Sequence, residues 1–298
     1  MASNNKKILV TGAAGLIGRE IFQRLQKDHL NVIGVDNNSR FSTFIPNGNY
    51  ICSDLIDFIN NNENDFDIVY HMAAINGTSN FYKNPNAVLK NNTLIDLKLF
   101  EFVESNHLTK LIYASSSEII SDADEIPSSE ITDITIDNIH NPRWSYRIPK
   151  IMSENYLLNS NINYVIARFF NVYSEHCGNG HFLKDIVNKL NNKNYELQSP
   201  NETRSFCYVK DAVDALFAIQ HTDKTLFNIG NDEEITILEA ANVIAKALNI
   251  SPDWQFKSRL PGSSFRRCPD ISNLRKVYPE FAPADFNTVI HQIKDKLC

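Results

Sequence analysis

The sequence predicts an α/β protein in which a doubly wound parallel sheet is joined to a smaller C-terminal lobe. Three observations support this fold class. Short apolar runs alternate with amphipathic stretches over residues 1–170, a glycine-rich turn follows the first apolar run, and shorter, loop-rich pieces replace this rhythm from residue 171 onward. Strands separated by helices imply right-handed crossovers between parallel strands. Sheets of this kind bind ligands at the carboxyl ends of their strands.

The alternating pattern places each element in turn. The apolar runs predict strands over residues 7–10, 32–35, 68–71, 110–114 and 164–167. The amphipathic stretches predict helices over residues 16–26, 87–104 and 143–158, and a later one over 206–220 that packs back on the sheet. We therefore expect a sheet domain over residues 1–170 with 205–227 packed on it, and a substrate-binding lobe made of 171–204 and 228–298.

Composition and charge exclude several classes of function. Hydrophobic residues make up 43% and charged residues 21% of the 298 residues, as in folded globular proteins. A net charge of -6 without any run of Lys and Arg gives no footprint for nucleic acid or a membrane surface. No apolar run approaches the ~20 residues that span a bilayer. The five cysteines lack metal-binding spacing, which predicts reduced thiols, no metal and a cytoplasmic location.

A glycine-rich turn joins the first predicted strand to the first predicted helix. Residues 11–18 read TGAAGLIG, with glycines at Gly12, Gly15 and Gly18 and with Leu16 and Ile17 at the start of the helix. The glycines permit a tight turn, close approach of the backbone to a pyrophosphate, and packing of the helix on the sheet. The helix N-terminus supplies amides and a positive dipole. The flanking strand and helix distinguish the pattern from an ordinary turn and predict a Rossmann-type dinucleotide site.

An acidic residue ends the second predicted strand. Asp36 lies 18 residues after Gly18, where a carboxylate can accept hydrogen bonds from both hydroxyls of an adenosine ribose. It would also repel a 2'-phosphate, so we expect NAD rather than NADP, although Arg40 nearby could accommodate that phosphate. Asp54 and Leu55 follow a third strand, where the adenine would lie. A helix N-cap explains an aspartate at this place equally well.

A tyrosine and a lysine are four residues apart in the predicted helix 143–158. Tyr146 and Lys150 would lie on one face of that helix. An ammonium beside a phenol, with the positive nicotinamide of an oxidised cofactor, would lower the phenol pKa and let the tyrosine act as a general base. The spacing is common by chance. Here, however, it comes about 30 residues after Ser115, Ser116 and Ser117, at the sheet edge where a doubly wound protein does its chemistry.

The motifs in their joint order resemble a known family. They are TGAAGLIG at 11–18, HMAA at 71–74, SSSE at 115–118, YRIPK at 146–150, RFFNVY at 168–173, TRSFCYVKDAVDAL at 203–216 and FNIGNDEEITI at 227–237. Together they resemble the extended short-chain dehydrogenases/reductases, specifically the NAD-dependent sugar-nucleotide epimerase/dehydratase family. The resemblance covers nearly the whole chain. It implies an enzyme that binds NAD and a sugar nucleotide, and a homodimer formed through the predicted helices 87–104 and 143–158.

The resemblance also implies roles for residues around the reacting atoms and the cofactor. It implies that Ser116 bonds the reacting sugar oxygen, that Tyr146 is the base, and that Lys150 binds the nicotinamide ribose. Asn91 resembles a structural asparagine near the cofactor, although any polar helix residue would fit the same place. Further residues expected at the cofactor are Ala73 and Ala74, and Ser117 is expected at the substrate.

Two arginines and an asparagine are expected at the nucleotide. The resemblance implies that Asn171, Arg204 and Arg267 contact the diphosphate, because a guanidinium offers a fork of donors to phosphate oxygens. The alternative for either arginine is a surface ion pair.

Glu118 bears on the type of reaction. Members of this family move a hydride from a sugar carbon, usually carbon 4, to NAD, and the resulting ketone acidifies its neighbours. Glu118 resembles the glutamate of sugar-nucleotide 4,6-dehydratases and UDP-glucuronate decarboxylases, where a carboxylate can move a proton on that ketone. Its alternative is a solvated glutamate at a strand end. NPRW at 141–144 and Arg267 also resemble the decarboxylases, so we expect oxidation at carbon 4 followed by elimination or decarboxylation.

Other functions stay open from the sequence. His181 resembles the histidine of GDP-sugar 3,5-epimerase/reductases, whose partner is a cysteine where this chain has Glu118; a histidine in a surface loop is the alternative. A 4-epimerase, a 3,5-epimerase and a simple carbon-4 dehydrogenase use the same scaffold. A non-catalytic NAD sensor is a candidate of another class, and the presence of Ser116, Tyr146 and Lys150 argues against it.

Overall fold

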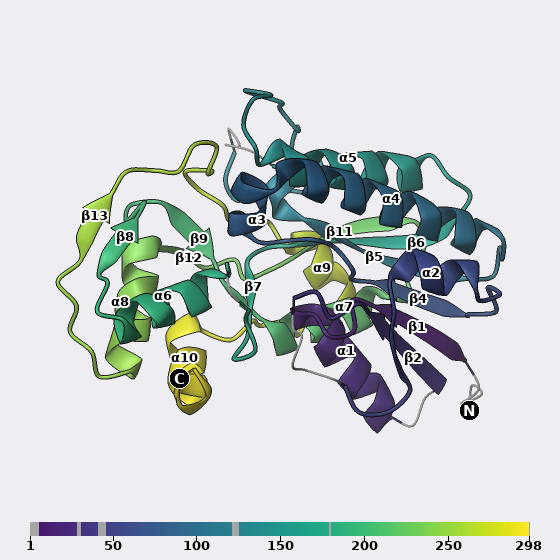
Figure 1. Cartoon of the computed structure of the whole chain (residues 1–298), viewed down its shortest axis with the longest axis horizontal. Helices are drawn as coiled ribbons and strands as arrows, with labels where there is room; N and C mark the ends of the chain where they lie inside the picture. The colour runs from purple at the N-terminus through teal and green to yellow at the C-terminus, as the bar shows by residue number, and fades with distance from the viewer. Residues whose placement is uncertain (1–5, 29–30, 41–45, 121–124, 179, 298) are drawn as a thin grey trace.

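The chain folds around a seven-stranded parallel sheet, which confirms the predicted fold class. A computed structural model describes residues 6–28, 31–40, 46–120, 125–178 and 180–297 (Figure 1). The sheet has the order β11-β6-β5-β4-β1-β2-β3, and every neighbouring pair is parallel. Its strands are β1 (Lys7–Thr11), β2 (Asn31–Asp36), β3 (Tyr50–Cys52), β4 (Ile68–His71), β5 (Lys110–Ser116), β6 (Asn163–Phe169) and β11 (Thr225–Ile229). The chain runs outward from β1 in both directions, so the sheet is doubly wound.

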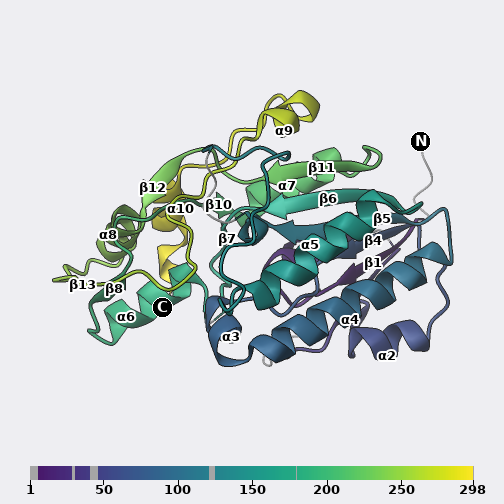
Figure 2. The same ribbon diagram turned by 90° about the horizontal axis from the view of Figure 1, so that it is seen from above.

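Helices cover both faces of the sheet (Figures 1 and 2). One face carries α2 (Leu55–Asn60), α4 (Pro85–Glu104) and α5 (Trp144–Leu158), and the other carries α1 (Leu16–Lys27), α7 (Val209–Ile219) and α9 (Ser272–Val277). Alternate residues of β1 join separate cores: Ile8 and Val10 pack on the α1 side and Leu9 on the α4 side. Burial on both faces explains why the strands are continuous apolar runs in the sequence.

The structure extends the predicted strands and adds one. Each of the five predicted ranges is a strand, and the strand expected just before Asp54 is the edge strand β3; the other edge strand, β11, was not predicted. β3 is three residues long, and its apolar side chains are half-buried or exposed. β11 alternates inward and outward residues less regularly and is identified by its pairing with β6, which depends on a distant part of the chain.

The predicted helix over 206–220 was wrong at its start. Cys207–Tyr208 forms strand β10, which pairs in parallel with β7 (Val172–Tyr173), and α7 begins only at Val209. Phe206 and Tyr208 pack instead against the aromatic ring of Tyr173. The aromatic residues therefore serve a β pairing that a helical periodicity in the sequence does not reveal.

The remaining elements lie beside the sheet, at the carboxyl ends of its strands (Figure 2). The helices here are α3 (Thr78–Lys83), α6 (Phe182–Asn191), α8 (Ile237–Ala247) and α10 (Phe286–Ile293). The strands are β8 (Glu196–Gln198), β9 (Thr203–Ser205), β12 (Glu234–Thr236) and β13 (Gln255–Lys257), paired as β8 with β13 and β9 with β12. α6, α8 and α10 contact one another or pack on a common core. The division into two lobes at the predicted residues stays a prediction.

Two simple features complete the description. Within the described ranges, no helix is long and apolar enough to cross a membrane. Cys52, Cys177, Cys207 and Cys268 are free thiols, and Cys298 lies outside the described residues.

Candidate functional site

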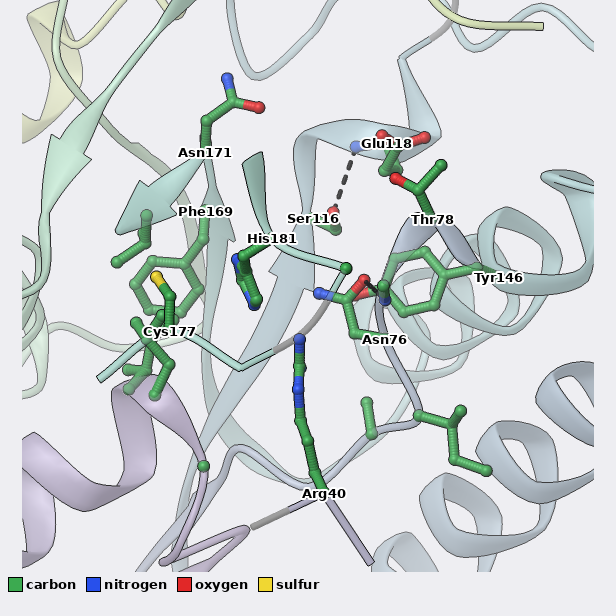
Figure 3. A pocket seen from close by; sticks show the side chains of 18 of the residues that line it. Arg40, Asn76, Thr78, Ser116, Glu118, Tyr146, Phe169, Asn171, Cys177 and His181 are labelled. Atoms are coloured by element: carbon green, nitrogen blue, oxygen red, sulfur yellow. Dashed lines mark hydrogen bonds between the residues drawn. The ribbon is translucent and has the colours of Figure 1, made fainter. Parts of the chain in front are cut away.

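A cavity of about 750 Å³ opens at the carboxyl ends of the central strands (Figure 3). Every residue that the sequence places at the cofactor or the substrate lines it. On the cofactor side these are Gly12, Gly15, Leu16, Ile17, Gly18, Asp36, Asp54, Leu55, Ala73, Ala74 and Asn91. On the other side these are Ser116, Ser117, Glu118, Tyr146, Lys150, Asn171, His181, Arg204 and Arg267. The fold thus brings the predicted residues together, while the role of each stays a prediction.

The glycine-rich turn forms the floor of the cavity between β1 and α1. Gly12 has a φ of +68°, and a Cβ at this position would lie 2.7 Å from the backbone nitrogen of Ala73. A Cβ at Gly18 would overlap the carbonyl oxygen of Gly12. α1 begins at Leu16, and its N-cap residue, Gly15, has no side chain to occupy the first amides of the helix. The turn is therefore a cradle that a diphosphate can approach closely, and it fits a dinucleotide such as NAD.

Two acidic residues line the outer part of this groove. Asp36 ends β2, and its carboxylate accepts hydrogen bonds from the backbone amides of Ala14 (3.1 Å) and Asn38 (2.8 Å). Burial raises the pKa of Asp36 above its usual value. Asp54 is the N-cap of α2 and accepts from the amide of Ile56 at 2.9 Å. The helix N-cap that the sequence offered as an alternative to adenine contact is therefore formed. Because Asp54 also lines the cavity, capping and adenine contact do not exclude each other.

Asn92, next to the predicted Asn91 on α4, is the asparagine that makes buried hydrogen bonds to the backbone, and the role of Asn91 near the cofactor stays a prediction. Asn92 is fully buried, accepts from the amide of Ile75 at 2.7 Å, and donates to the carbonyl of Ile75 at 3.0 Å. Asn91 is exposed at the edge of the cavity. Successive helix residues point about 100° apart, so a shift of one position separates an inward from an outward side chain. Asn92 fixes the loop after β4 that forms one wall of the cavity.

Ser116, Tyr146 and Lys150 lie together at the centre of the cavity. Ser116 is the last residue of β5, and Tyr146 and Lys150 lie on α5 (Figure 3 labels Ser116 and Tyr146). The ring of Tyr146 stacks on Phe81 with centroids 5.0 Å apart. Burial raises the pKa of Tyr146, and the side chain of Ser116 opposes this through a hydrogen bond. A nearby positive charge is therefore required before this phenol can work as a base near neutral pH.

Glu118 is enclosed by arginines. It lies in the 3-10 turn η1 (Ser117–Ile119), and its side chain is only 14% exposed. Oε1 of Glu118 is 2.6 Å from Nη1 of Arg267 and 3.2 Å from Nη2 of Arg143, and Oε2 is 3.6 Å from Nε of Arg147. Burial acts to raise the pKa of Glu118, but the three guanidinium groups hold it well below its usual value.

This surrounding changes the interpretation of Glu118. The side chain is not the solvated strand-end glutamate of the alternative interpretation, because it is buried and ion-paired. A general acid or base works best when its pKa is near the working pH, and a permanently ionised carboxylate cannot donate a proton there. Glu118 therefore fits the role of a counter-ion that holds Arg143 and Arg267 in the cavity wall better than the role of a proton carrier.

The arginine cluster consists of Arg143, Arg147, Arg204 and Arg267. All four side chains are buried, and Arg143, Arg204 and Arg267 line the cavity. Arg204 donates to Glu202 at 2.9 Å, and burial together with Arg267 lowers its pKa to about 10. Neither Arg204 nor Arg267 is in a surface ion pair. Four guanidinium groups share the two carboxylates of Glu118 and Glu202, so the cluster keeps an excess of positive charge inside the cavity wall.

Asn171 and His181 also line the cavity. Asn171 has a φ of 38°, and its amide nitrogen donates to the carbonyl of Ser205 at 2.9 Å. His181 precedes α6 and points into the cavity near Arg40 and Cys177 (Figure 3). Its Nε2 atom is buried and has no hydrogen-bond partner among the described residues. Burial and the charge of Arg40 lower its pKa to about 3, so His181 is a neutral imidazole in the cavity and not a surface-loop residue.

Sequence reasoning missed part of this site. Arg143 was noticed as part of a motif, but neither it nor Arg147 was assigned to the site. Their positions three residues before and one residue after Tyr146 would have placed Arg143 on the face of the helix near that tyrosine. The pairing of Arg143 and Arg267 through Glu118 depends on contacts between residues 25 and 149 positions apart, which no local pattern carries.

Comparison with known protein families agrees with this geometry. The sequence profile described as the NAD-dependent epimerase/dehydratase family matches residues 8–230, which is more than half of the chain. An uncharacterised protein of Methanocaldococcus jannaschii, MJ1055, is 30% identical and aligns with 91% of this chain and 90% of its own length. UDP-glucuronic acid decarboxylase 1 of Xenopus tropicalis is 27% identical and aligns with 99% of this chain and 73% of its own length.

Solved structures show the same fold. The UDP-glucose 4-epimerase of Thermotoga maritima, crystallised with UDP-glucose, superposes with a TM-score of 0.86 over 97% of this chain and 98% of its own. The two sequences are 20% identical, so this similarity concerns the fold alone.

Proposed function

This chain belongs to the NAD-dependent epimerase/dehydratase family, and we propose that it oxidises carbon 4 of a nucleotide-linked uronic acid and then releases the sugar carboxylate as carbon dioxide. The chain is an enzyme of this family with NAD as its cofactor. The finer assignment is supported by the decarboxylase relatives and by one feature of the site. That feature is the positive excess of the arginine cluster beside Ser116 and Tyr146.

The arginine cluster favours a substrate with more than one anionic group. A nucleotide diphosphate occupies some of the guanidinium donors in any sugar nucleotide. Arg143 is the N-cap residue of the helix that carries Tyr146, three residues before that tyrosine, and it pairs with Glu118, two residues after Ser116. A carboxylate attached to the reacting sugar can therefore find a positive partner close to the reacting carbon. A neutral hexose would leave this part of the cluster without a ligand, which is costly for buried charges.

The residues of this chain supply the proton steps. The glycine-rich turn, Asp36 and Lys150 would hold NAD, and the bound cofactor would supply reversible acceptance of the hydride from carbon 4. Tyr146 removes the proton of the 4-hydroxyl, and the new carbonyl oxygen is held by the hydroxyls of Ser116 and Tyr146. The sugar is then a β-keto acid: the bond from carbon 5 to the carboxylate breaks, carbon dioxide leaves, and the electron pair forms an enolate on the oxygen of carbon 4. A proton added at carbon 5 gives the keto-pentose.

This sequence of steps fits an ion-paired Glu118. Loss of carbon dioxide from a β-keto acid requires no base to remove a proton from carbon. Elimination of water does require one, and the low pKa of Glu118 makes its carboxylate a weak base. The proton at carbon 5 therefore comes from water, and His181, whose pKa of about 3 leaves it neutral, lies in the same cavity with an Nε2 that is unpartnered among the described residues and can orient such a water.

The test is a reaction panel followed by mass spectrometry. The full-length protein with NAD is incubated separately with UDP-glucuronate, UDP-glucose and the corresponding GDP- and dTDP-sugars. We expect loss of carbon dioxide from the glucuronate alone, with no lasting accumulation of NADH. A product of unchanged mass would replace the proposal by an epimerase. Loss of water would replace it by a dehydratase, and loss of only two hydrogens by a simple dehydrogenase.

A second candidate is an epimerisation next to the carbon-4 ketone. His181 supports it, because its Nε2, unpartnered within the described ranges, can accept a proton from a carbon beside the ketone, and the imidazolium formed in that step can return the proton to the other face. The same panel separates the two functions, since an epimerised product keeps its mass and appears only as a second chromatographic peak.

A further inference from the structure

A buried polar network lies directly behind Lys150, between α4, α5, β4 and β5. At its centre is Asp96 of α4, which is fully buried. The carboxylate of Asp96 accepts hydrogen bonds from the hydroxyls of Tyr113 (2.6 Å) and Ser153 (2.7 Å) on one oxygen. Its other oxygen is 2.9 Å from Nε2 of His71. No sequence motif pointed to Asp96, and the proposed reaction gives it no task.

The network ends at the Lys150 ammonium. Nζ of Lys150 donates to the hydroxyl of Tyr113 at 2.9 Å and lies 3.8 Å from Oδ2 of Asp96. Tyr113 thus links the two charges, because its oxygen accepts from Lys150 while its proton goes to Asp96. An ammonium has three N–H groups, so Lys150 can still donate into the cavity that it lines.

The opposite end of the network reaches the glycine-rich turn. Nδ1 of His71 is 2.7 Å from the hydroxyl of Thr11, and that hydroxyl oxygen accepts from the amide of Ala73 at 3.3 Å. Because the carboxylate of Asp96 can only accept, Nε2 of His71 carries the proton that it donates to Asp96, and Nδ1 of the neutral ring accepts from the hydroxyl of Thr11. Every donor along this path has an acceptor, as a buried polar network requires.

We propose that Asp96 is a positioning residue that keeps the Lys150 ammonium charged and fixed at the cavity wall, so that Lys150 can act on Tyr146. The inference rests on the proposed pairing of Tyr146 with Lys150. A lysine as buried as Lys150 would otherwise lose its proton, because desolvation disfavours the charged form. Asp96 opposes that loss with a full negative charge at the distance of a hydrogen-bonded bridge.

The other groups around Lys150 do not replace Asp96. Burial lowers the pKa of His71 and raises the pKa of Tyr113, so both are neutral. Glu154, on the same helix as Lys150, is bound by two donors of Arg168 at 2.8 and 2.6 Å. On the cavity side, the charged groups that act on Tyr146 include Glu118 and Arg40, and Glu118 is already enclosed by arginines. Among the described residues near Lys150, Asp96 is thus the carboxylate that no arginine neutralises.

The test measures the protonation of Lys150 without any substrate. Full-length protein, freed of bound nucleotide with charcoal, is treated with acetic anhydride across a pH series, and acetylation of Lys150 relative to a small reference amine is followed by peptide mass spectrometry. The anhydride reacts only with the neutral amine and does not itself titrate. In Asp96→Asn we expect half-maximal reaction of Lys150 at least about one pH unit lower than in the unaltered protein, because the buried ammonium has lost its counter-ion. Asp96→Thr, a second uncharged replacement, should shift it in the same direction.

Two matched variants separate charge from packing. Ser153→Ala removes one hydrogen bond to the same oxygen of Asp96 but no charge, and Tyr113→Phe removes the bridge to Lys150 but no charge. Neither should lower the pH of half-maximal acetylation of Lys150 by as much as Asp96→Asn. Equal shifts in all three variants, or no shift in Asp96→Asn, would overturn the proposal. Because the readout needs no turnover, it stands apart from the test of the decarboxylation.

The same variants give a second readout in the active enzyme. Turnover should fall at high pH when the Lys150 ammonium loses its proton, because this charge stabilises the Tyr146 phenolate. In Asp96→Asn the pKa of Lys150 is lower, so the alkaline limb of the turnover profile should move to lower pH. Tyr113→Phe should lower turnover while leaving that limb in place. A purely structural Asp96 would lower turnover at every pH alike, and that outcome would contradict the proposal.

Discussion

Tyr146 is the residue that decides between an enzyme and a sensor. It lies on α5 with its ring stacked on Phe81, and burial raises its pKa. A nearby positive charge would lower that pKa and let the phenol act as a base. Removing the phenol oxygen in Tyr146→Phe should lower turnover by roughly 10²–10⁴-fold, the usual contribution of a general base. NAD binding, measured by fluorescence titration, should change little. Tyr156→Phe on the outer part of the same helix is the control and should keep full turnover.

Arg143 tests the preference for an acidic sugar. We expect Arg143→Gln to raise the KM for UDP-glucuronate by roughly 10–100-fold, because a buried charge-assisted hydrogen bond contributes about 1.5–3 kcal/mol. Oxidation of UDP-glucose, if any is detected, should change by much less. Arg266→Gln removes an exposed arginine that pairs with Glu234 and should leave both substrates unaffected. An equal loss for both sugars would place Arg143 at the shared diphosphate instead.

At the scale of the helices, Asp54 separates capping from cofactor binding. Asp54 caps α2 at the edge of the cavity, and Thr236 caps α8 with a complete capping box away from the glycine turn. Replacing either residue by alanine should cost about 1 kcal/mol of stability, the usual cost of a lost N-cap. Only Asp54→Ala should also weaken NAD binding if the adenine lies beside it. Denaturant unfolding and NAD titration measure the two effects separately, and equal NAD affinity in both variants would leave Asp54 as a cap alone.

The periodicity of apolar residues in the sequence predicts some of the helices and strands and not others. Strands buried on both faces, such as β1 and β4, are continuous apolar runs, and the amphipathic α1 follows a recognisable turn, so both could be predicted. β11 escaped because an edge strand depends on its partner for its identity, and β3 was expected only as an unbounded strand before Asp54. The sequence pointed to Asn91 and not to the buried Asn92, because a sequence pattern does not determine the rotation of a helix to within one residue. Family motifs supplied the cavity residues, which periodicity alone would have left scattered.

At the scale of the whole molecule, the features that the sequence could not predict are the long-range electrostatic contacts. Glu118 was expected to move protons because its neighbours in the sequence allow it. Its partners in space are Arg143 at the N-cap of α5 and Arg267 from a loop near the C-terminus. These ion pairs fit a counter-ion better than a proton carrier, and the catalytic role of Glu118 stays a prediction. Asp96 carries no local signal either, since its partners come from β4, β5 and α5. The chemistry of both carboxylates follows from which elements meet at the cavity.

The preference for NAD over NADP depends on several residues at the carboxyl edge of the sheet. Thermal unfolding with each cofactor measures this preference. With NAD at 100 times its Kd the folded state should gain about 2.7 kcal/mol, which corresponds to a Tm increase of roughly 5 °C for a chain of this size. NADP at the same concentration should raise the Tm much less, because the carboxylate of Asp36 at the end of β2 repels the added phosphate. Asp36→Asn keeps the shape of the side chain and removes its charge, so it should narrow the gap between the two cofactors. Equal stabilisation of the unaltered protein by NAD and NADP would instead indicate that Arg40, which also lines the cavity, receives the phosphate.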